Sequence, residues 1–222
     1  MEPIPWFVEP VRAALAAGTR SEPLDSAGAR PAAVLLMLFE QGGEPALVLT
    51  KRSDTVRHHK GEISFPGGMQ DPVDADLLAT AIRETVEELG VDAADVDVIG
   101  ELNELHTYVT GFVIKPYVAY VRAREIYEHS VDEIAEVLRV PLRRLTEVGH
   151  EAEWERQGFR FTTNVFEVDG HVIWGATGRI LRDFLDVVAP ALDLEWSPGS
   201  VGTGDVVPIE GGDDRWTTPS RS

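Results

Sequence analysis

Two stretches in the first half of the chain decide its fold and chemistry: GGMQDPVD at residues 67–74 and RETVEELG at residues 83–90. In the second stretch, Glu84, Glu87 and Glu88 have the spacing i, i+3 and i+4, which places them on one face of a helix. Like charges in this arrangement repel, by roughly a few tenths of a kcal/mol per pair on an exposed helix. Mg²⁺ or Mn²⁺ removes that penalty, because these cations prefer oxygen ligands. The alternative is a solvated charged face, since glutamate is a good helix former.

The residues around the carboxylates favour the metal site over the solvated face. Gly67 and Gly68 allow the backbone to come close to a metal or a phosphate, and the Gly68 carbonyl can add a ligand. Arg83 can reach Glu87 at i+4 and orient its carboxylate. The two stretches together therefore predict a metal-assisted phosphate site.

The densest basic cluster of this acidic chain stands just upstream. Arginine forks suit the binding of phosphates, which predicts a clamp for a polyanionic substrate. The alternatives are a solvated loop or a metal site that uses the two histidines, but no nearby spacing supports zinc. The cluster consists of Arg52, Arg57, His58, His59 and Lys60. We expect Arg52, Arg57 and Lys60 to bind substrate together with Gly67 and Gly68.

The residues 83–91 resemble the second half of the Nudix hydrolase box, which reads Arg-Glu-apolar-x-Glu-Glu-x-Gly-apolar. Thr85 stands where that box has an apolar residue. If Gly68 is the box glycine, Asp74 occupies the first acidic position, but eight residues rather than seven separate it from Arg83.

A second resemblance concerns the coenzyme A pyrophosphatase branch of the family. Its extra motif is similar to LTKRS at 49–53, Arg57 and GEISFPGG at 61–68. Two shorter matches lie downstream, TGF at 110–112 with Pro116 and IWGAT at 173–177. The resemblance covers roughly residues 30–188.

This resemblance implies hydrolysis of the pyrophosphate bond of coenzyme A or its thioesters, to 3′,5′-ADP and a 4′-phosphopantetheine product. Mg²⁺ or Mn²⁺ would be held by Glu84, Glu87, Glu88 and the Gly68 carbonyl. Other Nudix enzymes bring a general base from a late loop, which points to residues 147–157; the alternative is a solvated loop. The candidates there are Glu147, Glu151, Glu153 and Glu155. Two other functions stay open: a Nudix pyrophosphatase for ADP-ribose or NADH, and a non-catalytic nucleotide-binding regulator.

Composition narrows the class of protein. The 222 residues include 20 basic and 38 acidic ones, a net charge of −18, which argues against nucleic-acid binding. A hydrophobic fraction of 43% supports a real core, and the absence of cysteine excludes disulfides. No apolar stretch approaches the roughly 20 residues of a membrane span, so we expect a cytoplasmic protein with a small-molecule substrate.

Hydrophobic patterns predict a single α/β (α+β) domain with a mixed sheet packed between helices. The resemblance likewise implies the Nudix fold. Asp74 is expected to cap a helix at 75–89 that Gly90 ends. A hairpin around Asp169-Gly170 is expected within 159–174. Further helices are expected near the N-terminus and at 131–138 and 180–188. Further strands are expected at 32–39, 46–50, 96–99 and 112–121.

The predicted boundaries divide the chain into three parts: an N-terminal helix and linker at 1–30, the domain at 31–194, and a disordered acidic tail at 195–222. Of the last 28 residues, 15 are Gly, Pro, Ser or Thr, which is typical of disorder. Trp196 and Trp216 leave open that part of the tail docks on the domain.

Overall fold

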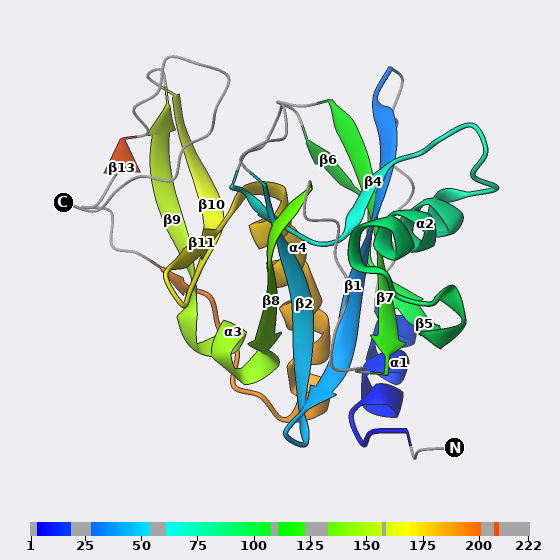
Figure 1. The fold of residues 1–222 in the computed structure, drawn as a ribbon. Coiled ribbons are helices and arrows are strands. Elements are labelled where there is room, and N and C mark those ends of the chain that lie inside the picture. Colours follow the sequence, from blue (N-terminus) through cyan, green and yellow to red (C-terminus); the bar gives the residue numbers. More distant parts are fainter. Residues whose placement is uncertain are drawn as a thin grey trace.

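The computed structural model describes residues 4–18, 28–53, 61–107, 111–122, 133–156, 159–200 and 207–208. Its larger sheet is mixed and is packed between helices, as expected (Figure 1). Strand β1 pairs parallel with β7 and antiparallel with both β2 and β4. The strands of this sheet are β1 (Arg30–Gln41), β2 (Glu44–Arg52), β3 (Ile63–Ser64), β4 (Gly67–Met69), β5 (Val96–Glu101), β6 (Leu105–Thr107), β7 (Phe112–Val121) and β8 (Ile134–Pro141).

Strand β1 shows why the sheet has helices on both faces. Its apolar run is continuous because alternate side chains enter different cores. Leu35 and Met37 pack with α2 (Leu77–Leu89), while Leu36 and Leu38 pack with α1 (Val8–Ala17) and α4 (Gly175–Val188). The short helix α3 (Leu142–Val148) and the 3₁₀ turns Ala93–Asp95 and Pro190–Leu192 complete the helical elements of the described chain.

A smaller sheet lies beside the first and carries β9 and β10 at its centre (Figure 1). The predicted hairpin is confirmed, with Val168 opposite His171 and the turn at Asp169-Gly170. The segment 147–157, however, is not a loop, because Gly149–Arg156 pairs along its length with Phe159–Phe166. The strands are β9 (Gly149–Arg156), β10 (Phe159–Val168), β11 (His171–Ile173), β12 (Gly199–Ser200) and β13 (Val207–Pro208).

The prediction of a helix at 131–138 is wrong. Residues 134–141 form β8, which pairs antiparallel with β2 from Ala46 opposite Pro141 to Arg52 opposite Ile134; residues 131 and 132 lie outside the described chain. The spacing of the apolar residues is compatible with either period over so short a run. The edge of β2 decides the outcome, because it offers a row of backbone hydrogen bonds.

The start of α2 also differs from the expectation. Asp76 rather than Asp74 caps the helix, by accepting a 2.8 Å hydrogen bond from the Ala79 backbone. The predicted end is confirmed, since Gly90 takes the left-handed conformation at φ 64°.

The predicted boundaries of the domain are too narrow at both ends. Phe7, Val8 and Val11 of the N-terminal segment are fully buried in the core that α4 covers. Trp196 stacks on Phe166, with ring centroids 6.0 Å apart, and β12 pairs with β9. The boundary at Leu194 is therefore wrong, because residues just beyond it pack on the domain. Most of 201–222, including Trp216, lies outside the described residues. None of the described helices has the length and apolar character needed to cross a membrane.

Candidate active site

Two glycines at β4 bring the backbone against α2. A side chain at Gly68 would place its Cβ 2.5 Å from the Glu84 carboxyl carbon, so any larger residue there would displace the Glu84 carboxylate. Gly67 has φ 149°, and a Cβ on it would lie 2.3 Å from the Ala33 carbonyl oxygen. The pairing of Ala33 with Gly68 in β1 and β4 fixes this approach. The sheet and the helix thus hold backbone and carboxylate in contact.

Glu88 is the most unusual carboxylate of the described chain. Its side chain is 4% exposed, and Oε2 has no hydrogen-bond partner among the described residues. Burial raises the pKa of Glu88 to about 7; the charge of Arg52 opposes this rise, and that of Glu84 adds to it. Burial likewise raises the pKa of Glu84. A buried carboxylate with an unsatisfied oxygen requires a cation or a proton.

Arg83 joins the carboxylates of α2 to Asp74. Its Nη1 donates to Glu84 Oε1 at 3.0 Å and to Glu87 Oε2 at 3.2 Å. Its Nε and Nη2 donate to the two oxygens of Asp74 at 2.9 and 3.0 Å, a bidentate pair. The Arg83 side chain holds the pKa of Asp74 well below its usual range, helped by hydrogen bonds from the backbone of Asp71 and from Thr80. Despite its shifted position, Asp74 is therefore the anchor of Arg83.

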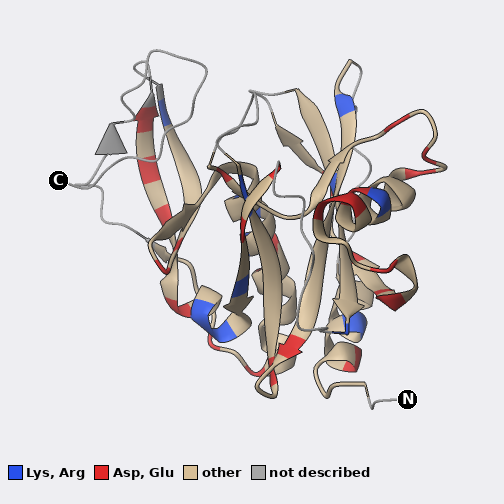
Figure 2. Ribbon diagram, in the orientation of Figure 1, with Lys and Arg blue, Asp and Glu red and all other residues tan. Residues whose placement is uncertain are grey.

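The three glutamates do not share one environment. Glu84 and Glu88 lie beside the glycines, whereas the Glu87 side chain is 59% exposed and turned toward Arg83. Figure 2 shows acidic and basic segments side by side on the α2 ribbon. Within the described ranges, no three acidic or histidine side chains converge as a ready-made metal site. The oxygen donors, the unpaired Glu88 Oε2 and the close Gly68 backbone nevertheless fit a hard divalent cation.

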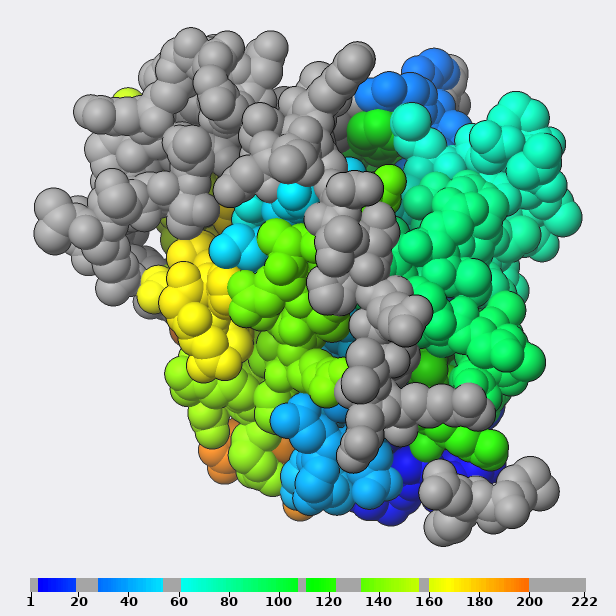
Figure 3. All heavy atoms as spheres, viewed as in Figure 1, coloured from blue at the N-terminus to red at the C-terminus, as the bar shows by residue number. Residues whose placement is uncertain are grey.

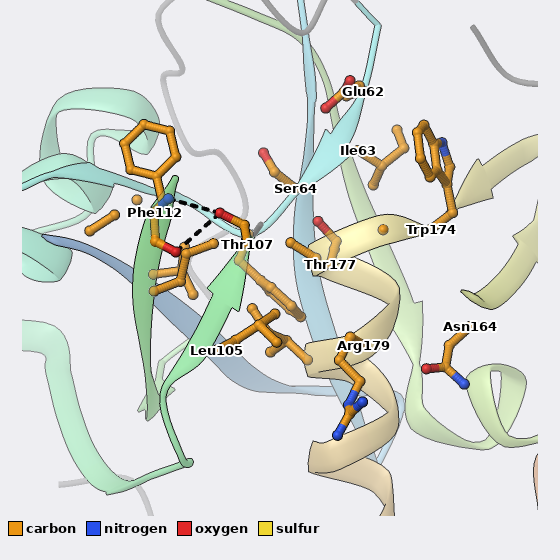
Figure 4. Close-up of a pocket in the computed structure, with 18 of the residues that line it drawn as sticks. Glu62, Ile63, Ser64, Leu105, Thr107, Phe112, Asn164, Trp174, Thr177 and Arg179 are labelled. Carbon is orange, nitrogen blue, oxygen red and sulfur yellow. Dashed lines mark hydrogen bonds between the residues drawn. The ribbon is translucent and has the colours of Figure 1, made fainter. Parts of the chain in front are cut away.

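A cavity of about 700 Å³ borders the two glycines (Figure 4). Its walls come from both sheets and from the start of α4. Arg52 lines it, as expected for a substrate residue, and so do Phe112 and Trp174 from the two downstream stretches. The Arg30 guanidinium lies over the ring of Phe112, 4.2 Å from the ring centroid. Arg57, His58, His59 and Lys60 lie outside the described residues.

Two residues near the site have no signal in the sequence. Glu133 precedes β8, and its charge contributes to the raised pKa of both Glu84 and Glu88. It was missed because the surrounding segment reads as a helix. Asn164, in β10, lines the cavity and is 7% exposed. Nothing in its local sequence distinguishes it from any polar residue of a strand.

The glutamates of 147–155, predicted as a source of the general base, stand elsewhere. Figure 2 shows acidic residues along β9, and none of the four lines the cavity. Glu147 pairs with Arg144 at 3.3 Å, Glu151 with Arg182 at 3.1 Å, and Glu155 with Arg160 at 3.1 Å. Figure 3 shows α2 and the yellow β10 region at opposite ends of one face.

Comparison with known proteins agrees with this geometry. Residues 29–162 match the family model of the NUDIX domain. The chain is 38% identical over 156 residues to an "Uncharacterized Nudix hydrolase NudL" of Cronobacter sakazakii, covering 69% of this chain and 80% of the relative. A protein of the same name from Yersinia pestis is 34% identical over 166 residues, with 74% and 82% covered.

The similar solved structures are more distant in sequence. An Ap4A hydrolase complex of C. elegans has a TM-score of 0.44 at 20% identity, over 53% of this chain and 84% of that one. A MutT/nudix protein of Enterococcus faecalis has a TM-score of 0.47 at 14% identity, over 79% and 69%. The family match and the 38% identical relative establish that this chain belongs to the Nudix hydrolases, which are metal-dependent pyrophosphatases acting on diphosphate compounds.

Proposed function

We propose that the protein hydrolyses the pyrophosphate bond of coenzyme A or its thioesters, releasing 3′,5′-ADP and a 4′-phosphopantetheine product. One observation carries the proposal. Arg52, from the stretch that is similar to the coenzyme A pyrophosphatase motif, lines the same cavity as Gly67 and Gly68, and its charge acts on Glu88. These contacts support a single site for Arg52, the glycines and the box on α2.

The metal would be held by Glu84 and Glu88, with the Gly68 carbonyl and with Glu87 once that side chain leaves Arg83. Mg²⁺ or Mn²⁺ bound there supplies charge for the phosphoryl oxygens and lowers the pKa of a water. The chain's own residues orient the reactants. Arg52 faces the phosphates, and Arg83, held by Asp74, keeps the helix carboxylates in place.

Glu133 is our candidate for the proton acceptor of the attacking water, because its charge is felt at both Glu84 and Glu88. Arg57 and Lys60 are proposed to bind the 3′-phosphate. Since a charge-assisted hydrogen bond contributes roughly 1.5–3 kcal/mol, coenzyme A is expected to have a kcat/KM about ten- to a hundredfold above that of dephospho-coenzyme A.

The test is a panel of diphosphate substrates with Mg²⁺ or Mn²⁺, with products identified by mass. The panel contains coenzyme A, acetyl-coenzyme A, dephospho-coenzyme A, ADP-ribose and NADH. We expect the highest kcat/KM with coenzyme A or its thioester, and 3′,5′-ADP as a product. A higher kcat/KM for ADP-ribose or NADH would refute the proposal, and so would the absence of hydrolysis of every member at saturating metal.

A further inference from the structure

The cavity contains a buried polar side chain that the proposed chemistry leaves unused. Asn164 lines the cavity at 7% exposure. A carboxamide has two donor hydrogens and an acceptor oxygen, yet that of Asn164 makes no hydrogen bond to another described residue. Its polar atoms are not among the fully buried unpaired side-chain atoms of the described residues, so they are open to the cavity. A ligand in the cavity can therefore supply their partner.

Two charged neighbours of Asn164 in the described chain have partners of their own. Glu151 stands directly opposite on β9, but it pairs with Arg182 at 3.1 Å. Arg179 of α4 donates to both oxygens of Asp183, at 2.9 and 3.1 Å. Glu151 and Arg179 therefore each have a partner of opposite charge. The carboxamide therefore remains available to a neutral group.

The position of Asn164 is fixed by close packing. A Cβ on Gly178 would lie 2.2 Å from the Asn164 carbonyl oxygen, so α4 and β10 touch at this point. Figure 4 shows Asn164 beside α4 and away from Glu62 and Ser64. A rigid backbone on which the carboxamide is mounted lowers the entropy cost of binding a ligand.

The cavity walls between Asn164 at one end and Glu62 and Ser64 at the other are apolar. Leu105, Ile114, Phe161, Trp174 and Ile180 line the cavity. Few unpaired charges face it within the described chain, so a nucleotide with extra phosphates fits it less well than a neutral, mostly aliphatic arm. A few polar groups in an apolar pocket are what orients such a ligand.

We propose that Asn164 determines specificity by hydrogen-bonding an amide in the substrate's non-nucleotide arm, which lies in this cavity. The inference rests on the proposed function, because coenzyme A and its thioesters carry an arm with two secondary amides. A secondary amide offers one donor and one acceptor, which match those of a carboxamide. The arm thus extends from the metal-binding glutamates along the apolar walls to β10.

Two products separate the arm from the nucleotide in the experiment. Inhibition constants are measured for 4′-phosphopantetheine and for 3′,5′-ADP, with wild-type enzyme, Asn164→Leu and Asn164→Asp. We expect the inhibition constant of 4′-phosphopantetheine to rise by a factor of roughly 5 to 100 in Asn164→Leu, the effect of an unpaired polar group. The constant for 3′,5′-ADP should stay within about twofold. Asn164→Asp, which keeps an acceptor but loses the donors, should show the same selective loss.

Val121→Ala is the control. Val121, at the end of β7, is 1% exposed and packs in a cluster none of whose members lines the cavity. This variant should lower the melting temperature and leave both inhibition constants unchanged. Asn164→Leu should keep or raise the melting temperature, because it removes a polar side chain that has no hydrogen bond to the described residues.

Equal losses for both products, or no loss for either, would overturn the role of Asn164 even if the wild type hydrolyses coenzyme A. If the wild type neither hydrolyses coenzyme A nor binds 4′-phosphopantetheine, the proposed function and this inference fall together. Hydrolysis of coenzyme A by the wild type with unaffected Asn164 variants removes the inference alone.

Discussion

At the scale of one residue, Glu88 is a carboxylate whose burial favours the binding of a cation. It is 4% exposed, its Oε2 is unpaired among the described residues, and its pKa is raised to about 7 by burial. Without a cation, the ionised form is destabilising above its ordinary pKa of about 4. We therefore propose that the lower stability is the consequence of a site that binds a metal.

Replacing Glu88 by Gln keeps the shape and removes the charge. We expect kcat to fall at least about a hundredfold at saturating Mg²⁺, because a ligand is lost. In EDTA the melting temperature should be equal or higher, since a buried charge disappears. Glu153→Gln, on β9 and away from the cavity, is the control and should keep wild-type turnover. Turnover of Glu88→Gln within a few-fold of wild type would exclude Glu88 as a ligand.

Asp74 makes a prediction about pH. Its pKa is lowered in the folded state, chiefly by Arg83, so its contribution to stability is complete above the unfolded pKa of about 4. That contribution is lost as the pH falls below this value, because the proton then competes with Arg83.

The difference in unfolding free energy between wild type and Asp74→Asn should accordingly be constant from pH 5 to 7 and shrink toward pH 3. Urea unfolding at each pH measures it. A difference that does not change over this range would mean that the ion pair with Arg83 is absent in solution.

At the scale of elements, close contacts at glycines set the distances between α4, β10 and α2. A Cβ on Gly178 would lie 2.2 Å from the Asn164 carbonyl oxygen, so α4 lies directly against β10 at this point. Because the contact is made by the Asn164 backbone and by helix α4, neither side can move away easily from an added side-chain atom.

Gly178→Ala is therefore expected to destabilise the protein by about 1–3 kcal/mol, the usual cost of overpacking. It should also reduce turnover, because α4 and β10 form walls of the cavity. Gly199→Ala serves as the control, since its Cβ would meet only the His150 Cβ at 3.8 Å, an ordinary contact. Equal melting temperatures for the two variants would show that α4 moves freely against β10.

At the scale of the whole molecule, the chain beyond the last helix fastens the smaller sheet to the core. Trp196 stacks on Phe166 and donates a 2.7 Å hydrogen bond to Asp186. Phe166 belongs to the core between the larger sheet and α4. Trp196 thus connects both sheets and the last helix.

A chain that ends after Leu194 should have a melting temperature several degrees lower. Trp196→Ala should lower the free energy of unfolding by about 1–3 kcal/mol, because the stacking and the burial of the ring are lost. A chain that ends after Pro208 keeps Trp196, β12 and β13, and should melt close to the full-length protein. If the chain ending at Leu194 melts like the full-length protein, the contact of Trp196 contributes nothing in solution.

The sequence by itself determined the family, the acidic helix of the Nudix box, the strand β1 and the hairpin at Asp169-Gly170. These features depend on neighbours within a few residues, through periodicity, capping and turn chemistry, and on a box of fixed spacing. The pairing of Arg83 with Glu87 was predictable for the same reason, because i and i+4 face each other on any helix.

The tertiary structure alone decided the rest. Residues 134–141 form a strand because the edge of β2 offers backbone hydrogen-bond partners. Trp196 packs on the domain because its ring stacks on that of Phe166. Glu133 and Asn164 entered the site from segments that carry no motif. Such contacts join residues far apart in the chain, and their energies depend on burial and distance, which local patterns do not contain.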